Sequence, residues 1–452
     1  MRTALGCRAE DLGPDGVRTI KLAILDLLGC CVAGADALGS RLVATWAHAA
    51  SGARGDAVII GTELRATPAL AALANGASGH ALDYDDVSVR MIHPSVTIVP
   101  ALLAAGAARG ATGRSLLDGY LAGFEVEARL CKALNPDHYA RGWHTTGSIG
   151  TLGAALASCR ALDLDEAPSR HALGVAASSA GSIRKNFGSM VKPLHAGQAS
   201  FHGLQAAELA ASGFTADTSV LEGPRGFLDV FSSLDRAAEL AEAFEDDAPY
   251  ELVASGIALK RFACCGAIHS AQDAILELRA SAGFAPGDVD RIECRVNPLI
   301  PGILVHHVTQ DPLEGKFSVE FCLAVCLADG RAGLAQYTAA RAADPELLEL
   351  MRRIDVVVDA SIPVDLAYFP SVVTVSLTDG RRLSTRVDVP TGYPEKPLSV
   401  DAVVDKAREC AAPTLGATRF DELVATVLHL EDLEDVGTLA ALLAIDGDGR
   451  AS

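Results

Sequence analysis

The sequence predicts a mainly α-helical protein, with a large all-helical domain and a smaller α+β domain. Half of the 452 residues are hydrophobic but only 5% are aromatic, so the apolar mass is mostly Ala, Leu and Val. Long apolar runs, separated by joints rich in Gly, Pro and Asp, fill the first half of the chain. After residue 260, short alternating segments typical of strands are interleaved with helical ones.

Apolar runs at helical spacing predict helices from residue 17 to residue 211. Several runs are apolar on more than one face, which is typical of interior helices in a thick bundle. Residues 215–231 are expected to form a structured loop, and a helix is expected again at 234–245. The first seven predicted helices cover 17–33, 66–81, 95–109, 115–133, 147–160, 167–180 and 196–211.

The α+β domain is expected at 265–397. Its clearest signal is a β-hairpin around Asp379-Gly380, because a two-residue Asp-Gly turn joins two alternating segments. Residues 1–264 are expected to form the all-helical domain, and helices within 398–452 should complete it. Strands are predicted at 291–296, 354–358 and 372–377, and helices at 268–280, 317–328, 346–353, 399–411, 419–430 and 435–444.

Charge and hydropathy exclude two classes of function. The formal net charge is −19, which argues against nucleic-acid binding, because phosphate contacts need a basic face. No stretch reaches 18 clean apolar residues, so no membrane span is predicted. The N-terminus lacks the apolar core of a secretory signal, and the eleven cysteines include no Cys-x-x-Cys pair. We therefore expect a cytoplasmic protein with reduced, mostly buried thiols.

Cations and histidines are concentrated at 184–203 of this acidic chain. Lys192 precedes Pro193, which biases the lysine backbone away from the helical region, and a helix is expected to begin near His195. A lysine and a histidine beside a helix start suit a carboxylate, because unpaired N–H groups and the helix dipole favour an anion there. A polar loop between two buried helices explains the same residues equally well.

Carboxylates gather where one predicted helix ends. Residues 83–86 (Asp-Tyr-Asp-Asp) follow the helix at 66–81, where negative charge is unfavourable for the helix dipole. His93 lies just before the next helix, in a position that suits a solvent-facing pocket. The alternatives are a loop with solvated carboxylates and a metal site, since Asp and His both bind divalent ions. The spacing matches no recognised ligand pattern, so no metal is predicted.

Two further segments carry candidate side chains. His144 precedes another predicted helix, and histidine is the usual general acid or base near neutral pH. Lys260 stands at the boundary between the predicted domains, where small-molecule clefts often form. For Cys265, a buried inert thiol is favoured over a nucleophile, because no signature supports nucleophilic catalysis.

Six short motifs follow one another along the chain. They are Gly-His-Ala-Leu-Asp-Tyr-Asp-Asp at 79–86, His-Pro-Ser at 93–95, Gly-Trp-His-Thr-Thr at 142–146, Lys-Asn-Phe-Gly-Ser-Met-Val-Lys-Pro-Leu-His-Ala-Gly at 185–197, Lys-Arg-Phe at 260–262 and Lys-Phe-Ser at 316–318. In this order they resemble the MmgE/PrpD family, which includes 2-methylcitrate dehydratase, cis-aconitate decarboxylase and iminodisuccinate epimerase. The resemblance extends from residue 17 to about residue 330, and more weakly beyond.

The resemblance implies a large helical domain with a smaller α+β lid domain, a homodimer, and an active site between the domains. It implies a small carboxylate substrate and neither a metal nor an organic cofactor. The family's reactions share the formation or quenching of a carbanion next to a carboxylate. The implied catalytic residues are Asp83, His93, His144, Lys192 and Lys260. The implied substrate-binding residues are Lys192, Lys260, His195, Cys265 and Phe321.

Three positions depart from the decarboxylase branch of the family. Val87 stands where a Thr is common, Cys265 where a His is found, and Phe321 where a Tyr is found. These departures argue for related chemistry on a different substrate. We therefore expect a cofactor-independent lyase, a dehydratase or decarboxylase, acting on a small di- or tricarboxylate. The alternative is an epimerase of an iminodisuccinate-like dicarboxylate, and a non-enzymatic helical binding protein is less favoured.

The resemblance also suggests a catalytic role for each residue. Lys192 and Lys260 would hold substrate carboxylates as negative charge spreads. His93 and His144 would move protons, and Asp83 would orient a histidine or act as the base.

Overall fold

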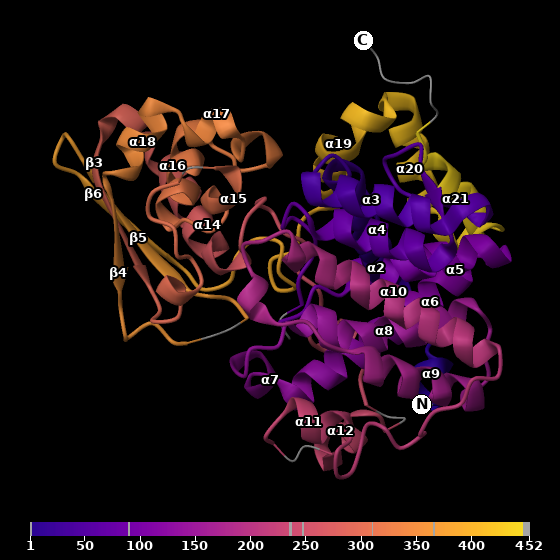
Figure 1. Ribbon diagram of the computed structural model, residues 1–452. Coiled ribbons are helices and arrows are strands. Elements are labelled where there is room, and N and C mark those ends of the chain that lie inside the picture. The colour runs from indigo at the N-terminus through magenta and orange to yellow at the C-terminus, as the bar shows by residue number, and fades with distance from the viewer. Residues whose placement is uncertain are drawn as a thin grey trace. The chain divides into compact units, whose positions relative to one another are not determined.

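The computed structural model of the chain (Figure 1) describes residues 2–88, 91–234, 237–245, 248–309, 311–364 and 367–445. The chain divides into two compact units, which are described separately. The helical unit comprises Met1–Ile257 and Val400–Ser452, and the mixed unit comprises Ala258–Ser399. The mainly α-helical class is confirmed. Residues 446–452 of the predicted C-terminal segment lie outside the described residues.

Buried helices form the core of the helical unit, and all seven predicted helices of its first part are present. They are α2 (Gly13–Gly34), α4 (Pro68–His80), α5 (Ser95–Arg109), α6 (Gly113–Leu134), α8 (Thr145–Ala161), α9 (Glu166–Ser179) and α10 (Val191–Ala211). The other helices are α1 (Arg2–Gly6), α3 (Leu38–Ser51), α7 (Asp137–Ala140), α11 (Phe227–Phe231), α12 (Ala237–Ala243), α13 (Glu251–Ala254), α19 (Val400–Leu415), α20 (Ala417–Leu428) and α21 (Val436–Leu442).

Helix α10 packs against α4 and α8 near the centre of this unit. A Cβ atom on Gly76 of α4 would lie 2.8 Å from the Cα of Gly197 on α10. A Cβ atom on Gly197 would lie 2.2 Å from the carbonyl oxygen of Leu73. The two backbones therefore touch with no side chain between them. This crossing brings the end of α4 beside the start of α10.

Several details of the helical unit differ from the sequence-based expectation. Helix α10 begins at Val191 rather than near His195, so Lys192 and Pro193 lie in its first turn. Proline is tolerated there because its missing N–H would have had no partner inside the helix. The unit is also not all-helical, because the two-residue strands β1 (Ala57–Val58) and β2 (Arg65–Ala66) pair antiparallel.

Helix α3 and the segment after α10 give the other differences. Helix α3 was not predicted, because its large apolar residues face outward and only small ones are buried. The predicted loop at 215–231 ends in the short helix α11. Within the helix predicted at 234–245, residues 235–236 lie outside the described residues, and α12 covers Ala237–Ala243.

The mixed unit contains a four-stranded sheet in the order β4-β3-β5-β6. Strands β5 and β6 form the predicted hairpin, and β3 pairs parallel with β4 and antiparallel with β5. Helices lie along one face of the sheet (Figure 1), with α14 packed against β5 and β6. The strands are β3 (Val289–Val296), β4 (Ile354–Val358), β5 (Ser371–Leu377) and β6 (Arg382–Val387). The helices are α14 (His269–Ala282), α15 (Pro312–Gly315), α16 (Val319–Asp329), α17 (Ala339–Ala342) and α18 (Pro345–Met351).

The C-terminal helices and the cysteines follow the predictions. Helix α19 packs on α2, where Lys406 and Asp26 form a buried ion pair of 2.7 Å. All eleven cysteines are free thiols, and every one except the half-buried Cys265 is buried. Among the described residues, no single helix is long and apolar enough to cross a membrane. Within the same residues, one bent pair of helical segments reaches that length and composition: Ala9–Gly34 together with Leu38–Arg54, with a 90° bend between them.

Candidate active site

The loop after α4 carries the carboxylates predicted from the sequence. Asp83 has a φ of 52°, a left-handed backbone conformation that Asp adopts more readily than most residues. Its side chain and those of Asp85 and Asp86 are buried, at 6%, 0% and 0% exposure. The alternative of a loop with solvated carboxylates is therefore wrong. Buried carboxylates need partners, and the partners of the first two lie in the candidate site.

Asp83 pairs with the predicted carboxylate ligand Lys192. The lysine Nζ donates to Asp83 Oδ1 at 2.9 Å, and both side chains are largely shielded from water. Lys192 also lies over the ring of Phe187, 5.4 Å from its centroid. An aromatic face attracts a cation, so the ring and the carboxylate together hold the ammonium group in place. Asp85, which the sequence analysis did not single out, contacts His80 and His93. The role predicted for Asp83, to orient a histidine or act as the base, stays a prediction.

Four histidines gather beside this ion pair and are called the histidine cluster: His80, His93, His144 and His195. The ring centroids of His80 and His93 are 4.5 Å apart, and those of His80 and His144 are 6.0 Å apart. The Nδ1 atoms of His144 and His195 are 3.0 Å apart, so one donates a hydrogen and the other accepts it. The cluster thus brings together three histidines that the sequence predicted and His80, which it did not.

A short antiparallel bridge holds His144 against the chain that leads into α10. The His144 N–H donates to the carbonyl of Ser182 at 2.9 Å, and the Arg184 N–H donates to that of Gly142 at 2.8 Å. At Gly147 a Cβ atom would lie 2.1 Å from Ser182 Oγ. Helix α8 therefore needs a glycine in its first turn to approach this segment closely.

The environment keeps the deepest histidines neutral near pH 7. Burial lowers the pKa of His80 to about 4, against the opposing pull of Asp85. Burial, followed by the positive potential of His80 and Lys192, lowers the pKa of His144 well below its usual value. Burial and Lys192 also lower the pKa of His195. Neutral imidazoles carry a lone pair, so these rings are equipped to accept protons.

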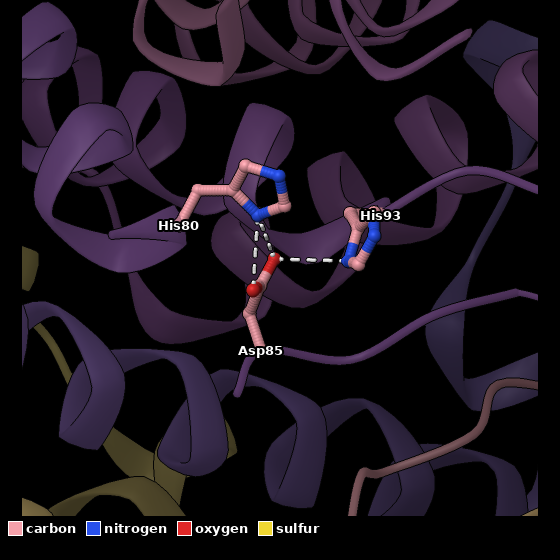
Figure 2. A group of neighbouring side chains, drawn as sticks. All are labelled: His80, Asp85 and His93. Atoms are coloured by element: carbon pink, nitrogen blue, oxygen red, sulfur yellow. Dashed lines mark hydrogen bonds and ion pairs between the residues drawn. The ribbon is translucent and has the colours of Figure 1, made fainter. Parts of the chain in front are cut away.

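Asp85 lies between two rings of the cluster (Figure 2). His80 Nδ1 lies 3.0 Å and 2.9 Å from the two Asp85 oxygens, and His93 Nδ1 lies 3.2 Å from Oδ2. These three side chains also form the one group of metal-binding type found among the described residues. Imidazole and carboxylate ligands suit a transition-metal ion, so this is the part of the helical unit that could hold one.

The remaining predicted residues lie in the mixed unit. Lys260 is 3% exposed, and its Cε lies 3.9 Å from the position of a Cβ on Gly266. The Cys265 N–H donates to the carbonyl of Lys316 at 3.1 Å, and Lys316 Nζ donates to the carbonyl of Ala263 at 2.9 Å. Hydrogen bonds therefore join the segment that follows the Lys-Arg-Phe motif to the first residue of the Lys-Phe-Ser motif.

Phe321 is fully buried on α16, with its ring centroid 5.8 Å from that of Tyr337. It belongs to the packed interior of the mixed unit as described. Its place in the substrate-binding set, like that of Cys265, stays a prediction.

A cavity of about 730 Å³ opens elsewhere on the helical unit, beside the first turns of α2 and α6. None of the predicted site residues lines it. Two of its cations are already paired, Arg8 with Asp118 and Lys21 with Glu431. We therefore do not assign this cavity to the reaction.

Comparison with known proteins confirms the resemblance. Residues 2–239 match the MmgE/PrpD N-terminal domain, and residues 262–431 match the MmgE/PrpD C-terminal domain. The chain belongs to the MmgE/PrpD family.

Proteins similar to this chain include several that are named cis-aconitate decarboxylase. That of Homo sapiens is 28% identical over 454 residues, which cover 97% of this chain and 92% of the human protein. That of Mus musculus is 28% identical with 97% and 91% coverage, and that of Aspergillus terreus is 28% identical with 96% and 93% coverage.

Within the MmgE/PrpD N-terminal domain, the sequence analysis missed two residues of the site. His80 and Asp85 both belong to the motif at 79–86, and their spacing of five residues was the available signal. A histidine in the last turn of a helix more often packs in the core, so the motif alone did not single it out. The contact with Asp85 arises from the turn at Asp83, which periodicity does not reveal.

Proposed function

We propose that this chain is a lyase that moves a proton next to a carboxylate of a small di- or tricarboxylate, with decarboxylation as the favoured reaction. The observation that carries this proposal is the buried Lys192–Asp83 ion pair beside a cluster of neutral histidines. A cation binds a substrate carboxylate, and neighbouring imidazoles handle the proton. The relatives named cis-aconitate decarboxylase support the choice of reaction.

In a decarboxylation, the bond between the reacting carbon and the departing CO₂ breaks. The electron pair stays on carbon as an enolate-like carbanion, and an acid then delivers a proton to it. Lys192 would stabilise the growing negative charge, and His93 or His144 would supply the proton. Substrate carboxylates add negative charge to the site, which raises the pKa of neighbouring histidines and converts one into that acid.

Two other reactions of the same intermediate are retained as alternatives. A dehydratase would protonate a departing hydroxyl, and an epimerase would place two groups on opposite sides of one carbon. The departures at Val87, Cys265 and Phe321 favour a substrate different from that of the decarboxylase branch. The stretches at 185–190 and 316–318 look more like the epimerase and uncharacterised branches of the family.

One experiment separates these reactions. The purified protein is incubated in D₂O with cis-aconitate, 2-methylcitrate and iminodisuccinate in turn, and products are followed by NMR and by CO₂ release. We expect CO₂ release with one deuteron incorporated per product. Loss of water would instead indicate a dehydratase, and exchange without net product an epimerase. No turnover and no exchange with a broad panel of such acids would contradict the proposed function.

Lys260, Cys265 and Phe321 of the mixed unit stay predicted substrate ligands, and Lys260→Ala is the direct test of the first. Cofactor independence also stays a prediction. It is checked by turnover after exhaustive chelation, which would lower the activity if a metal ion took part.

We also propose a homodimer, as the resemblance implies. Leu38, Leu42 and Trp46 form an exposed apolar stripe along α3, with 53%, 58% and 58% exposure. Met190, 53% exposed, lies against this helix at Gly39, just before α10. Contiguous apolar side chains on a surface favour association, so we expect a second copy to cover them. Light scattering of the wild type and Leu42→Lys tests this, with a monomeric wild type as the contradicting result.

A further inference from the structure

Asp85 is a fully buried carboxylate shared by two imidazoles of the histidine cluster (Figure 2). Both of its oxygens contact His80 Nδ1, and Oδ2 also faces His93 Nδ1. The two rings differ in accessibility, because the His80 side chain is 0% exposed and that of His93 is 14% exposed. His93 is therefore the member of this trio that a substrate can approach.

The two contacts also differ in quality. His80 makes hydrogen bonds to both oxygens, whereas His93 Nδ1 lies 3.2 Å from Oδ2 without forming a hydrogen bond. Hydrogen bonds of catalytic groups are often poorly aligned in the free enzyme and tighten in the complex. The looser ring is thus the one expected to move a proton, and the tighter ring anchors the carboxylate.

The protonation state of Asp85 decides which atom donates the hydrogen in each contact with a histidine. Burial opposes the ionisation of Asp85, but attraction from His80 and His93 holds its pKa well below the usual range. An ionised carboxylate only accepts hydrogen bonds, so each nitrogen that faces it must carry the hydrogen. His93 is then in the tautomer with Nδ1–H, and its Nε2 holds the lone pair.

We propose that Asp85 is a positioning residue that holds His93 in the Nδ1–H tautomer, leaving Nε2 to take up a proton and deliver it to the substrate, while His80 anchors the carboxylate from the other side. The remaining nitrogen of His80, Nε2, is buried and has no hydrogen-bond partner among the described residues. The ring is therefore oriented through Asp85, which fits an anchoring role. The inference deepens the proposed function, since it concerns the same site.

A metal ion bound by His80, Asp85 and His93 is the rival explanation. With the rings oriented as they are, the nitrogens that face Asp85 are the two Nδ1 atoms, and an ion held between them would need their lone pairs. The proposed arrangement uses the same atoms as N–H donors to Asp85. The two explanations therefore predict different states of His93 Nδ1, which NMR can measure. The atom carries a lone pair if a metal ion is bound and a hydrogen if it donates to Asp85.

The chain offers a matched control in the next residue. Asp86 is also fully buried, but Oδ1 accepts a hydrogen bond from the Ser95 N–H at 3.3 Å, and burial raises its pKa well above the usual range. Burial thus favours the neutral form of Asp86, and Asn reproduces the shape and charge of that form. Asp85→Asn instead removes a negative charge and presents an N–H₂ group to the histidines.

The experiment compares Asp85→Asn and Asp86→Asn by turnover across pH and by NMR of ¹⁵N-histidine-labelled protein. We expect Asp85→Asn to lose roughly 10²–10⁴-fold in kcat/KM, as when a histidine adopts the wrong tautomer. Asp86→Asn should stay within a few-fold of the wild type. In the NMR spectra, His93 should be the Nδ1–H tautomer in the wild type and Asp86→Asn, and should shift toward Nε2–H in Asp85→Asn.

Three results would overturn the inference. They are equal activity of the two variants, an Nε2–H tautomer of His93 in the wild type, or stoichiometric zinc bound to the purified wild type and lost in Asp85→Asn. The NMR spectrum of the wild type shows the tautomer of His93 and so tests the inference even if Asp85→Asn fails to fold. It also needs no substrate, so a failure of the proposed function would be distinguished from a failure of this inference.

Discussion

Two buried acidic regions adjoin each other in the helical unit. Their surroundings favour the ionised carboxylate in one region and the neutral carboxylic acid in the other. In the histidine cluster, Asp85 contacts two imidazoles and is ionised. In the region called here the acid core, Asp86 accepts from Ser95, and Glu127 Oε1 accepts from the Thr97 hydroxyl at 2.6 Å. The acid core has no cation at hydrogen-bond distance among its described contacts, and burial raises the pKa of both acids well above the usual range.

The difference shows that burial alone does not decide the charge of a carboxylate. Asp85 and Asp86 are consecutive and equally buried, yet one faces N–H groups of imidazoles and the other a backbone N–H beside a second acid. A partner able to carry positive charge keeps the first acid ionised, whereas without one the second takes up a proton. The histidine cluster therefore keeps a buried negative charge between its imidazoles, whereas the acid core contributes to packing.

The largest expected effect is on activity. His144→Ala should lower kcat/KM by roughly 10²–10⁴-fold, because loss of a general acid or base typically costs that much. Glu127→Gln in the acid core should stay within a few-fold, since Gln resembles the protonated acid. Turnover of the substrate identified by exchange measures both. If His144→Ala also stays within a few-fold, the candidate site is wrong.

A large effect on stability is expected for a buried ion pair outside the site. Lys406→Met leaves Asp26 buried without its partner and should lower the free energy of unfolding by about 3–5 kcal/mol. Lys192→Met should cost less stability, because its side chain is partly exposed, but should abolish most activity. Urea unfolding of both variants measures this, and a smaller loss for Lys406→Met than for Lys192→Met would contradict it.

His80 should make the fold sensitive to acid. Its folded pKa of about 4 lies below the unfolded value near 6.5, so the unfolded chain binds the extra proton between these pH values. Stability is therefore lost as the pH falls through this window. By this linkage, the free energy of unfolding should fall by about 2 kcal/mol less in His80→Gln than in the wild type when the pH drops from 7 to 5. Thermal unfolding at both pH values checks this, and parallel pH profiles for the two proteins would count against it.

The smallest expected effect has the opposite sign and concerns the acid core. Glu127 has a folded pKa above its unfolded value, so its contribution is present below the unfolded pKa and is lost as the pH rises. Glu127→Gln lacks this loss. Relative to the wild type, its stability should rise between pH 5 and pH 8, with the new amide N–H partly offsetting the gain. A relative stability that falls with pH would show that Glu127 is ionised.

The sequence predicted the helices of the core because they are long runs of apolar and small residues that are buried almost throughout, as in α5 and α8. It failed at α3, where Leu38, Leu42 and Trp46 face outward and small residues face the core. It also misplaced the start of α10, because the bias that Pro193 imposes on Lys192 is overridden once the first turn packs in place. In both places, tertiary packing overrides the preference of the local sequence.

The candidate site was predictable as a set of residue types but not as a set of contacts. His93, His144, His195, Lys192 and Asp83 were all singled out from their positions at helix ends. The pairing of Asp83 with Lys192, and of Asp85 with the histidines, depends on a left-handed residue in the loop. Such a turn is decided by its surroundings, because Asp adopts that conformation without requiring it.

The backbone contact between Gly76 and Gly197 bears on how this chain could evolve a new substrate preference. With no side chain between α4 and α10, ordinary drift of core residues leaves the spacing between Asp83 and Lys192 unchanged. New specificity would have to come from residues that do not set this spacing, such as the half-buried Val87. A laboratory selection for another carboxylate should therefore retain both glycines while position 87 varies freely.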